Sequence, residues 1–483
     1  MPAPAPDDAA PPAPAWLRLP EDADALEPGL WSDGAVRGED GAIRIAGVDV
    51  RELAERYGTP LLVIDEVCVR GRAAGILRTA REAFAEHGGR VRVYYAGKAM
   101  LTTHVVRWML AAGLHVDVCS EGELRIALAA GADPARIGMH GNNKSDAELE
   151  LAIGTGVGAI VADSLQELER IDRIASGLGR LQAVRIRSNP GVHASTHGFL
   201  ATAHEDQKFG IPLEQLPEAA GIARASSGMR LLGLHAHIGS QIFAADGFLA
   251  AAERLLAAHL RLLEDGPLPE LNLGGGFGIP QVEGERPADV AGIMRRLAGF
   301  LAGRCAELGV PLPLVAFEPG RSIIGPAGTT LYRIGTSKEV PVTVEDGRTA
   351  VRRYLSVDGG MSDNLRPALY GADATARLAD RRGAAPPRLS RVAGKHCEAG
   401  DVVVRDCYLP GDAEPGDLLA VPATGAYCAP MSSNYNAVPR PAIVAVREGE
   451  HRVLVRRERI ADLLARDTGA AGPTGPRSRQ EPA

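Results

Sequence analysis

Short apolar runs alternate with segments of helical length along residues 91–320. Eight runs rich in β-branched and aromatic residues recur, each ended by glycine or a polar residue: 91–97, 115–119, 137–141, 159–163, 181–188, 231–239, 270–276 and 314–320. Eight strand–helix units within roughly 230 residues are typical of a (β/α)8 barrel. The pattern therefore predicts an α/β barrel, with an open, doubly wound parallel sheet as the competing architecture.

One helix start strengthens this prediction. Between the second and third runs, Ser120 stands three residues before Glu123, ahead of an apolar periodicity over 124–130. Serine followed by glutamate at this spacing is the signature of a capping box. The segment therefore favours strand, turn and helix over one continuous helix.

Beyond about residue 330, segments of helical length no longer separate the apolar runs. Short alternating runs follow, joined by Gly, Pro and Asp turns: 330–337, 350–358, 402–408, 418–423 and 441–457. This pattern predicts a second, mostly β domain of β-sandwich or barrel-like form. Near the N-terminus, runs at 42–45 and 60–64 flank a helical segment at 50–57, and we expect them to complete that domain.

The expected organisation has five parts. Residues 1–15 are rich in Pro and Ala, and 468–483 in Gly, Pro and Arg, so both are expected to be disordered tails. Residues 16–64 are expected to join the β domain, 65–328 to form the barrel, and 329–467 to form the C-terminal β domain.

Polar residues and glycines gather at one end of the barrel runs. At or just past the C-terminal strand ends stand Lys98, Asp117, His140, Asn142, His235, His237, Ser240, Gly274, Gly275, Gly276, Glu318 and Arg321. The βα loops converge at this end of a barrel and form the catalytic face. An open sheet would place its ligand at a switch point and would not draw on nearly every strand.

Lys98 ends the first of these runs, VRVYYAGKAM. A lysine at a barrel mouth can form a Schiff base with an aldehyde cofactor, and burial can tune its pKa toward neutrality. Taken alone, however, a lysine at a strand end is more often simply solvated.

Three further features could serve an anionic, planar cofactor, and each has an ordinary structural alternative. The run Gly274 to Gly276 allows backbone amides to approach a phosphate, although glycines equally mark a tight turn. Ser240 offers a hydroxyl, and His237 offers a ring for stacking unless it is a core histidine. Glu318 could keep a pyridine nitrogen protonated, or could simply pair with an arginine.

Composition narrows the class of partner. The 483 residues carry a formal net charge of -7 with both signs interspersed, which argues against nucleic acid and membrane partners and favours a small molecule. The N-terminal sequence lacks a cationic segment followed by an apolar core, so no secretory signal is expected. The cysteines show no CxxC pair and indicate thiols of a reducing cytoplasm: Cys68, Cys119, Cys305, Cys397, Cys407 and Cys428.

Seven motifs in order carry a family resemblance: YYAGKAM, HAHIGSQI, LNLGGGFG, EPGRSIIGP, VDGGMSDNLRPALYG, GKHCEAGD and GAYCAPMSSNYN. The chain resembles the pyridoxal-phosphate-dependent group IV decarboxylases of the alanine-racemase-like barrel fold. Within them it is most similar to the diaminopimelate decarboxylases, particularly their actinobacterial branch. The resemblance spans about residues 30–465. With it, Lys98 is expected to bind a cofactor and not to be a solvated lysine at a strand end.

The resemblance implies a role for each matching residue. Lys98 matches the Schiff-base lysine, and Cys397 the general acid that protonates the substrate. The implied cofactor contacts are Lys98, His237, Gly239, Ser240, Gly274, Gly275, Gly276, Glu318, Gly320, Arg321 and Tyr427. The implied substrate contacts are Arg321, Arg366, Tyr370, Glu398 and Tyr427. Cys397 and Glu398 match a pair that the family contributes from the partner subunit, so a homodimer with shared active sites is implied.

The implied reaction converts meso-2,6-diaminoheptanedioate to L-lysine and CO2, the last step of lysine biosynthesis. Decarboxylation of ornithine, arginine or another basic amino acid is the alternative, although such substrates have no use for Arg366. An amino-acid racemase or a non-catalytic binding protein would not need the Cys397–Glu398 pair.

One segment departs from the family pattern, and a second carries three histidines that need a separate explanation. Ala429 and Pro430 depart from the usual family pattern next to the pocket. His193, His197 and His204 are expected to belong to the structure of the barrel mouth and not to a metal site, since no ligand spacing recurs. No metal is expected.

Overall fold

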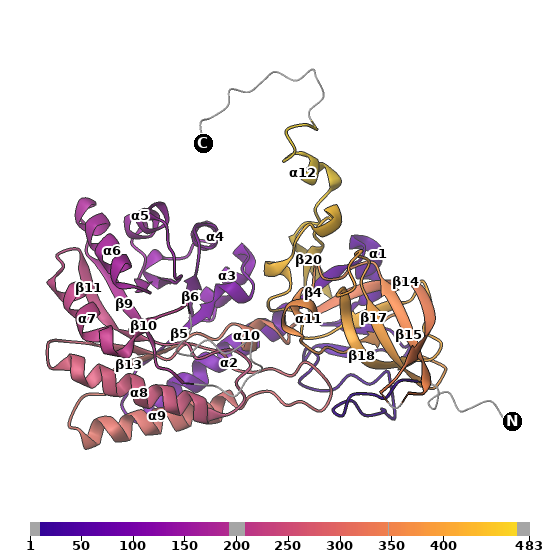
Figure 1. The fold of residues 1–483 in the computed structure, drawn as a ribbon, viewed down its shortest axis with the longest axis horizontal. Coiled ribbons are helices and arrows are strands. Elements are labelled where there is room, and N and C mark those ends of the chain that lie inside the picture. Colours follow the sequence, from indigo (N-terminus) through magenta and orange to yellow (C-terminus); the bar gives the residue numbers. More distant parts are fainter. Residues whose placement is uncertain (1–9, 193–207, 346, 471–483) are drawn as a thin grey trace.

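The computed structural model describes residues 10–192, 208–345 and 347–470, and places them in two domains (Figure 1). One is a barrel surrounded by helices, and the other is a mostly β domain. The expectation for His193, His197 and His204 lies outside the described residues. Most of the two predicted disordered tails lies outside them as well.

The barrel has the eight predicted strands. They are β5 (Val91–Ala96), β6 (His115–Val118), β7 (Ile137–Met139), β8 (Ala159–Ala162), β9 (Gln182–Asn189), β11 (Met229–His235), β12 (Glu270–Asn272) and β13 (Leu314–Phe317). All neighbours are parallel in the order β9-β11-β12-β13-β5-β6-β7-β8, and β8 pairs with β9 to close the ring. The predicted barrel is therefore confirmed, and the open sheet is excluded.

Helices cover the outside of this ring (Figure 1). They are α2 (Glu66–Ala85), α3 (Thr103–Ala111), α4 (Glu121–Ala129), α5 (Asp146–Thr155), α6 (Leu165–Gly177), α7 (Leu216–Ala225), α8 (Ala245–Leu263), α9 (Val290–Glu307) and the short α10 (Arg321–Ile324). Short 3-10 turns η1 (Gly97–Ala99), η2 (Pro134–Arg136) and η3 (Leu213–Gln215) and the two-residue strand β10 (Ile211–Pro212) complete the connections. Among the described helices, none is long and apolar enough to cross a membrane.

The cap of α4 forms with one difference from the prediction. The Ser120 side chain accepts the backbone N–H of Glu123 at 3.3 Å. The Glu123 carboxylate, however, accepts the N–H of Cys119 at 2.7 Å, one residue before the N-cap. The helix start was therefore correct, and the returning bond is displaced by one residue. A complete capping box starts α5 at Ser145.

The second domain is a large sheet in the order β18-β17-β15-β14-β4-β20-β21. Its strands are β14 (Gly328–Thr343), β15 (Thr349–Val357), β16 (Arg377–Leu378), β17 (Pro387–Ala393), β18 (Val402–Pro410), β19 (Leu418–Val421), β20 (Ala442–Arg447) and β21 (Glu450–Val455). All five predicted runs form strands, whereas β16 and β17 were not predicted. Short helical elements are α11 (Arg366–Tyr370), η4 (Ala429–Met431), η5 (Tyr435–Ala437) and α12 (Ile460–Leu464).

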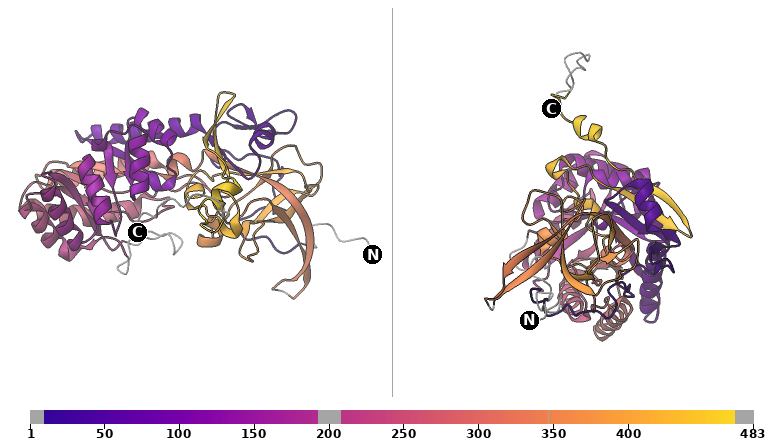
Figure 2. Two further views of the ribbon diagram at one scale, coloured as in Figure 1. Left: turned by 90° about the horizontal axis from the view of Figure 1, so that it is seen from above. Right: turned by 90° about the vertical axis from the view of Figure 1, so that its right-hand side faces the viewer.

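The N-terminal segment divides between two sheets. β1 (Ala35–Arg37), β2 (Ile43–Ile45) and β3 (Val48–Asp49) form a small sheet of their own, followed by α1 (Val50–Tyr57). β4 (Leu61–Asp65) enters the large sheet, antiparallel to β14 and parallel to β20. Figure 2, seen from above, shows this N-terminal indigo segment among the orange and yellow strands of the β domain.

β4 also joins the two hydrophobic cores. Its side chains alternate, so Leu62 and Ile64 pack in the core of the barrel while Leu61 and Val63 pack in a core of the β domain. Every residue of β4 is buried as a result. The opposite faces of β4 thus help to hold the two domains together, which fixes the loops of the β domain over the barrel mouth.

The barrel mouth is also held by a buried ion pair. The Lys144 ammonium donates to the backbone oxygens of Gly141 and Val161 and to the Glu167 carboxylate, each at 2.8 Å. Both charged side chains are almost fully buried. Loss of one partner would leave the other charge uncompensated in the interior.

We therefore expect Glu167→Ala to lower the free energy of unfolding by about 3–5 kcal/mol, measured by urea denaturation. Glu169→Ala is the matched control, because Glu169 is exposed on the same helix, and it should change stability by no more than about 0.5 kcal/mol. Equal stability of the two variants would show that the buried pair is not needed.

Candidate active site

A cavity of about 220 Å³ opens at the C-terminal mouth of the barrel. Nine of the fifteen predicted site residues line it: Lys98, His237, Ser240, Gly276, Glu318, Gly320, Arg321, Tyr370 and Tyr427. Ala96, Phe277 and Ser322 complete the wall. Residues from four barrel strands and from the β domain therefore meet at one site.

Lys98 reaches the cavity from the 3-10 turn η1 directly after β5. Burial acts to lower the pKa of Lys98, but Tyr427, Cys119 and Glu318 outweigh it and the net change is upward. The amine is therefore an ammonium at neutral pH, the opposite of what burial alone would give.

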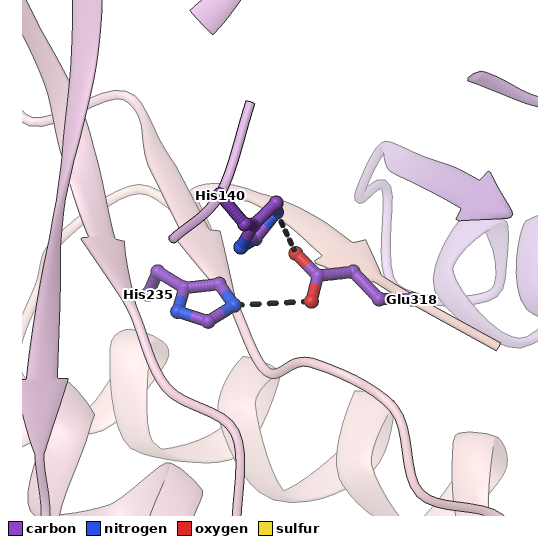
Figure 3. Close-up of side chains that lie close together, drawn as sticks. All are labelled: His140, His235 and Glu318. Atoms are coloured by element: carbon purple, nitrogen blue, oxygen red, sulfur yellow. Dashed lines mark hydrogen bonds and ion pairs between the residues drawn. The ribbon is translucent and has the colours of Figure 1, made fainter. Parts of the chain in front are cut away.

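Glu318 follows β13 and is held through both of its carboxylate oxygens (Figure 3). Oε1 accepts the Asn272 side-chain N–H at 2.7 Å and lies 3.3 Å from Nε2 of His140. Oε2 lies 3.0 Å from Nε2 of His235. Donor and acceptor atoms of the two histidines and Glu318 lie within 4.8 Å of one another, a spacing that these hydrogen bonds explain.

His140 also bridges to a second carboxylate. Its Nε2 lies 3.3 Å from Oδ1 of Asp117, the same distance as from Glu318. Burial acts to lower the pKa of His140, but Glu318 and Asp117 outweigh it and raise it to about 9. Burial lowers the pKa of His235 to about 4, so His235 is neutral.

The glycine loop after β12 contributes less to the cavity than predicted. The N–H of Gly274 binds Oδ1 of Asn272, and the N–H of Gly275 binds Nδ1 of His237. Only Gly276 of the three reaches the cavity wall. A Cβ on Gly276, whose φ is +112°, would lie 2.2 Å from the Gly239 carbonyl oxygen, so glycine is needed at position 276 for this close approach.

Two arginines stand next to each other on the side of the β domain. Arg321 donates to the Ser240 hydroxyl, and its guanidinium lies 4.5 Å from the centre of the Tyr427 ring. Burial and the nearby Arg366 lower the pKa of Arg321 to about 10. Arg366 is buried and donates to Gln281 and to the Ala423 carbonyl.

Within residues 10–192, 208–345 and 347–470, no carboxylate pairs with Arg321 or Arg366. Two neighbouring guanidinium groups without an anion repel each other. Such an arrangement suits an acidic ligand group.

Cys397 and Glu398 do not reach this cavity within the one chain. They lie exposed in the loop between β17 and β18. The preceding residue, His396, anchors that loop through Ser362 at 2.8 Å and Asn436 at 3.2 Å. The structure therefore presents the pair at the protein surface on a fixed loop.

A larger cavity, of about 430 Å³, lies between η1 and the β domain. Its wall mixes apolar residues, such as Leu62, Met100 and Ile443, with charged ones, such as Arg440 and Glu458. It contains none of the predicted site residues. The smaller cavity, where the titratable groups converge, is therefore the candidate active site.

Sequence reasoning placed His140, His235 and Asp117 on the catalytic face but gave them no role. Asn272, which fixes both Glu318 and the glycine loop, was not singled out. It is the last residue of β12, so its position at a C-terminal strand end was the available signal.

The fold and the cavity define the class. The family model of the pyridoxal binding domain of pyridoxal-dependent decarboxylases matches residues 74–325. This range contains the barrel strands and Lys98, His237 and Glu318. A barrel that presents a lysine, a glycine loop and a fixed carboxylate at its mouth is the architecture of that class.

Relatives narrow the class further. The diaminopimelate decarboxylase of Mycobacterium tuberculosis is 47% identical over 448 residues, covering 91% of this chain and 98% of the relative. A crystal structure of diaminopimelate decarboxylase from M. jannaschii superposes with a TM-score of 0.82 at 31% identity, covering 90% and 98% of the two chains. A co-complex of that protein with L-lysine gives a TM-score of 0.80 at 32% identity, with the same coverage. The chain belongs to the diaminopimelate decarboxylase family.

The glycine loop gives a direct test of the site geometry. A Cβ on Gly275 would lie 2.0 Å from the backbone oxygen of Glu318. We expect Gly275→Ala to displace Glu318 and lower the thermal midpoint by several degrees, measured by calorimetry.

Gly303→Ala is the matched control, because Gly303 is exposed in α9 with open space around its Cβ position. The same substitution should there stabilise the protein by about 0.5–1 kcal/mol. Opposite signs are expected for the two variants, and a stabilised Gly275→Ala would contradict the close approach.

Proposed function

We propose that this protein removes CO2 from meso-2,6-diaminoheptanedioate at its D-configured centre to form L-lysine, the last step of lysine biosynthesis. The observation that carries the proposal is the pair Arg321 and Arg366, which lack an anionic partner among the described residues. Arg321 lines the cavity that holds Lys98, and Arg366 is close enough to Arg321 to help lower its pKa. A substrate with a carboxylate at each end suits this arrangement. The family membership supports the same reaction.

The residues present fit pyridoxal 5′-phosphate. Lys98 would hold it covalently through the aldehyde, and Glu318 would face the ring nitrogen. Ser240 and Gly276 line the same cavity, and a Cβ on Gly276 would clash with the Gly239 carbonyl, so a hydroxyl and a bare backbone are available there to a phosphate. His237 lines the same cavity, and burial holds its pKa well below the usual range, so it offers a neutral ring for stacking.

When bound, this cofactor supplies an electron-withdrawing ring that accepts the electron pair left by the departing carboxylate. The protein's part is to orient the bond that breaks and to hold charges in place. Glu318, ionised and fixed through both oxygens, would keep a proton on the ring nitrogen. Arg321 and Arg366 would bind the carboxylate at the distal end of the substrate.

We also propose a homodimer in which each site is completed by the other chain. Cys397 and Glu398 of the partner subunit would face the cavity, the thiol delivering a proton to the substrate Cα and the carboxylate binding the distal ammonium. The exposed position of this pair on an anchored loop supports the proposal. A cytoplasmic location is proposed from the six cysteines, all of which are free thiols.

Decarboxylation of ornithine, arginine or another basic amino acid is less favoured. Such substrates carry no distal carboxylate, so they would leave Arg321 and Arg366 as two buried, adjacent cations. Because this repulsion would stay uncompensated, we expect the enzyme to turn over ornithine and arginine less well than diaminopimelate.

The deciding experiment offers diaminopimelate, lysine, ornithine and arginine separately to the holoenzyme and measures CO2 release. We expect release from diaminopimelate alone. Lys98→Ala should abolish both this release and the cofactor absorbance, because the covalent anchor is gone. Preference for ornithine or arginine, or full activity of the lysine variant, would overturn the proposed function.

A complementation assay tests the shared site. Lys98→Ala and Cys397→Ala proteins are each expected to be nearly inactive. After the two are mixed and their subunits exchanged, activity should recover to about one quarter of wild type, because half of the dimers are mixed and each mixed dimer has one intact site. If both residues of a site came from the same chain, no activity would return.

A further inference from the structure

Glu318 lies beside a second buried carboxylate, and only one cation separates them. Nε2 of His140 is 3.3 Å from Oδ1 of Asp117 and 3.3 Å from Oε1 of Glu318. Two carboxylates in such a low-dielectric interior cannot both be ionised unless a positive charge lies between them. The family resemblance assigns no role to His140 or Asp117.

His235 cannot supply that charge. Its Nε2 faces Oε2 of Glu318 at 3.0 Å, while its Nδ1 is buried and has no hydrogen-bond partner among the described residues. A proton on Nδ1 would therefore create a buried, unsatisfied donor. His235 is a neutral donor fixed in one tautomer, and Asn272 is a neutral donor as well.

We propose that His140 is a positioning residue whose imidazolium bridges Asp117 and Glu318, so that Glu318 faces the cavity as an anion at neutral pH. This inference rests on the proposed cofactor. Asp117, Glu318 and protonated His140 sum to one negative charge, which matches the one positive charge of a protonated ring nitrogen. The net negative charge of the three residues would thus neutralise the positive charge of the bound ring.

The direction of each pKa agrees with this geometry. Burial and Glu318 raise the pKa of Asp117 to about 6. The pKa of Glu318 is held well below its usual range, since His235 and His140 outweigh the opposing effect of burial. As the pH falls, Asp117 therefore takes up a proton before Glu318 does.

Other charged groups facing the bridge do not replace it. Glu123 on α4 adds a further acidic group near His140, while Lys98 and Arg187 act on Glu318, and Arg185 acts on Asp117. Arg185 is already bound to Glu270 and the Tyr94 hydroxyl. None of these cations is recorded within hydrogen-bond distance of both Asp117 and Glu318 in the described part of the chain.

The test uses holoenzyme loaded with pyridoxal phosphate labelled with ¹⁵N in the ring, since the nitrogen chemical shift reports ring protonation. Wild type is expected to keep a protonated ring at neutral pH, because the imidazolium of His140 leaves Glu318 ionised. In His140→Gln, Asp117 and Glu318 share a proton at neutral pH. Where that proton sits on Glu318 the ring loses its anionic partner, so the ring signal at neutral pH should lie closer to the unprotonated position than in wild type.

The double variant tests whether the effect of His140→Gln comes from the lost positive charge or from the altered shape of the side chain. His140→Gln combined with Asp117→Asn leaves Glu318 as the single carboxylate, so the protonated signal should return at neutral pH. If His140→Gln behaves as wild type, or if the double variant stays as deficient as His140→Gln, the proposed bridge is wrong. His259→Gln is the matched control, because His259 is an equally buried histidine on α8, and its profile should match wild type.

Failure of the proposed function and failure of the proposed bridge give different results. A wild-type protein that takes up no cofactor would defeat the proposed function itself, whatever the variants do. If His140→Gln fails to fold, Asp117→Asn tests the bridge through the His140 imidazole, observed by NMR with labelled histidine. The pKa of His140 should fall below its wild-type value in that variant, and an unchanged titration would overturn the proposal.

Discussion

The active site depends on one buried carboxylate whose two oxygens are both fixed. Glu318 follows β13, and the groups that hold it, Asn272, His140 and His235, come from β12, β7 and β11. These strands meet only because the barrel closes. A charge buried this deeply is tolerated because each oxygen has a donor, and the donors orient it toward the cavity.

The barrel and the β domain divide the chemistry between them. The barrel supplies Lys98, His237 and Glu318, which suit a planar cofactor, while Arg366, Tyr370 and Tyr427 come from segments of the β domain. β4 packs one of its faces in each core, and so helps to hold the site residues of the β domain in a fixed position relative to those of the barrel. The wall of the cavity is thus assembled from two separately folded parts of the chain.

Much of the fold was predictable from the sequence because the barrel strands are short runs rich in apolar and β-branched residues that end in glycine or polar residues. All eight strands were found in this way. β17 was missed because its sequence, PRLSRVA, starts with proline, which more often marks a turn or a strand edge. Its burial comes from pairing with β15 and β18, which local pattern does not encode.

The site was predictable only in part. Residue type and position at strand ends identified Lys98, Glu318 and Arg321, and the family resemblance gave them roles. The hydrogen bonds that occupy Gly274 and Gly275 depend on the tertiary positions of Asn272 and His237, so the sequence overestimated how much of the glycine loop reaches the cavity. The bridge of His140 joins residues from three different strands and could be seen only in the folded chain.

β4 and β20 are neighbours in the sheet although nearly the whole chain separates them. During synthesis every barrel strand leaves the ribosome before residues 442–447 do. Until then one edge of β4 is unpaired, and its apolar side chains lack part of their cover, the combination that recruits other chains. Nascent or C-terminally truncated chains are thus exposed to aggregation through the same strand that later joins the two domains.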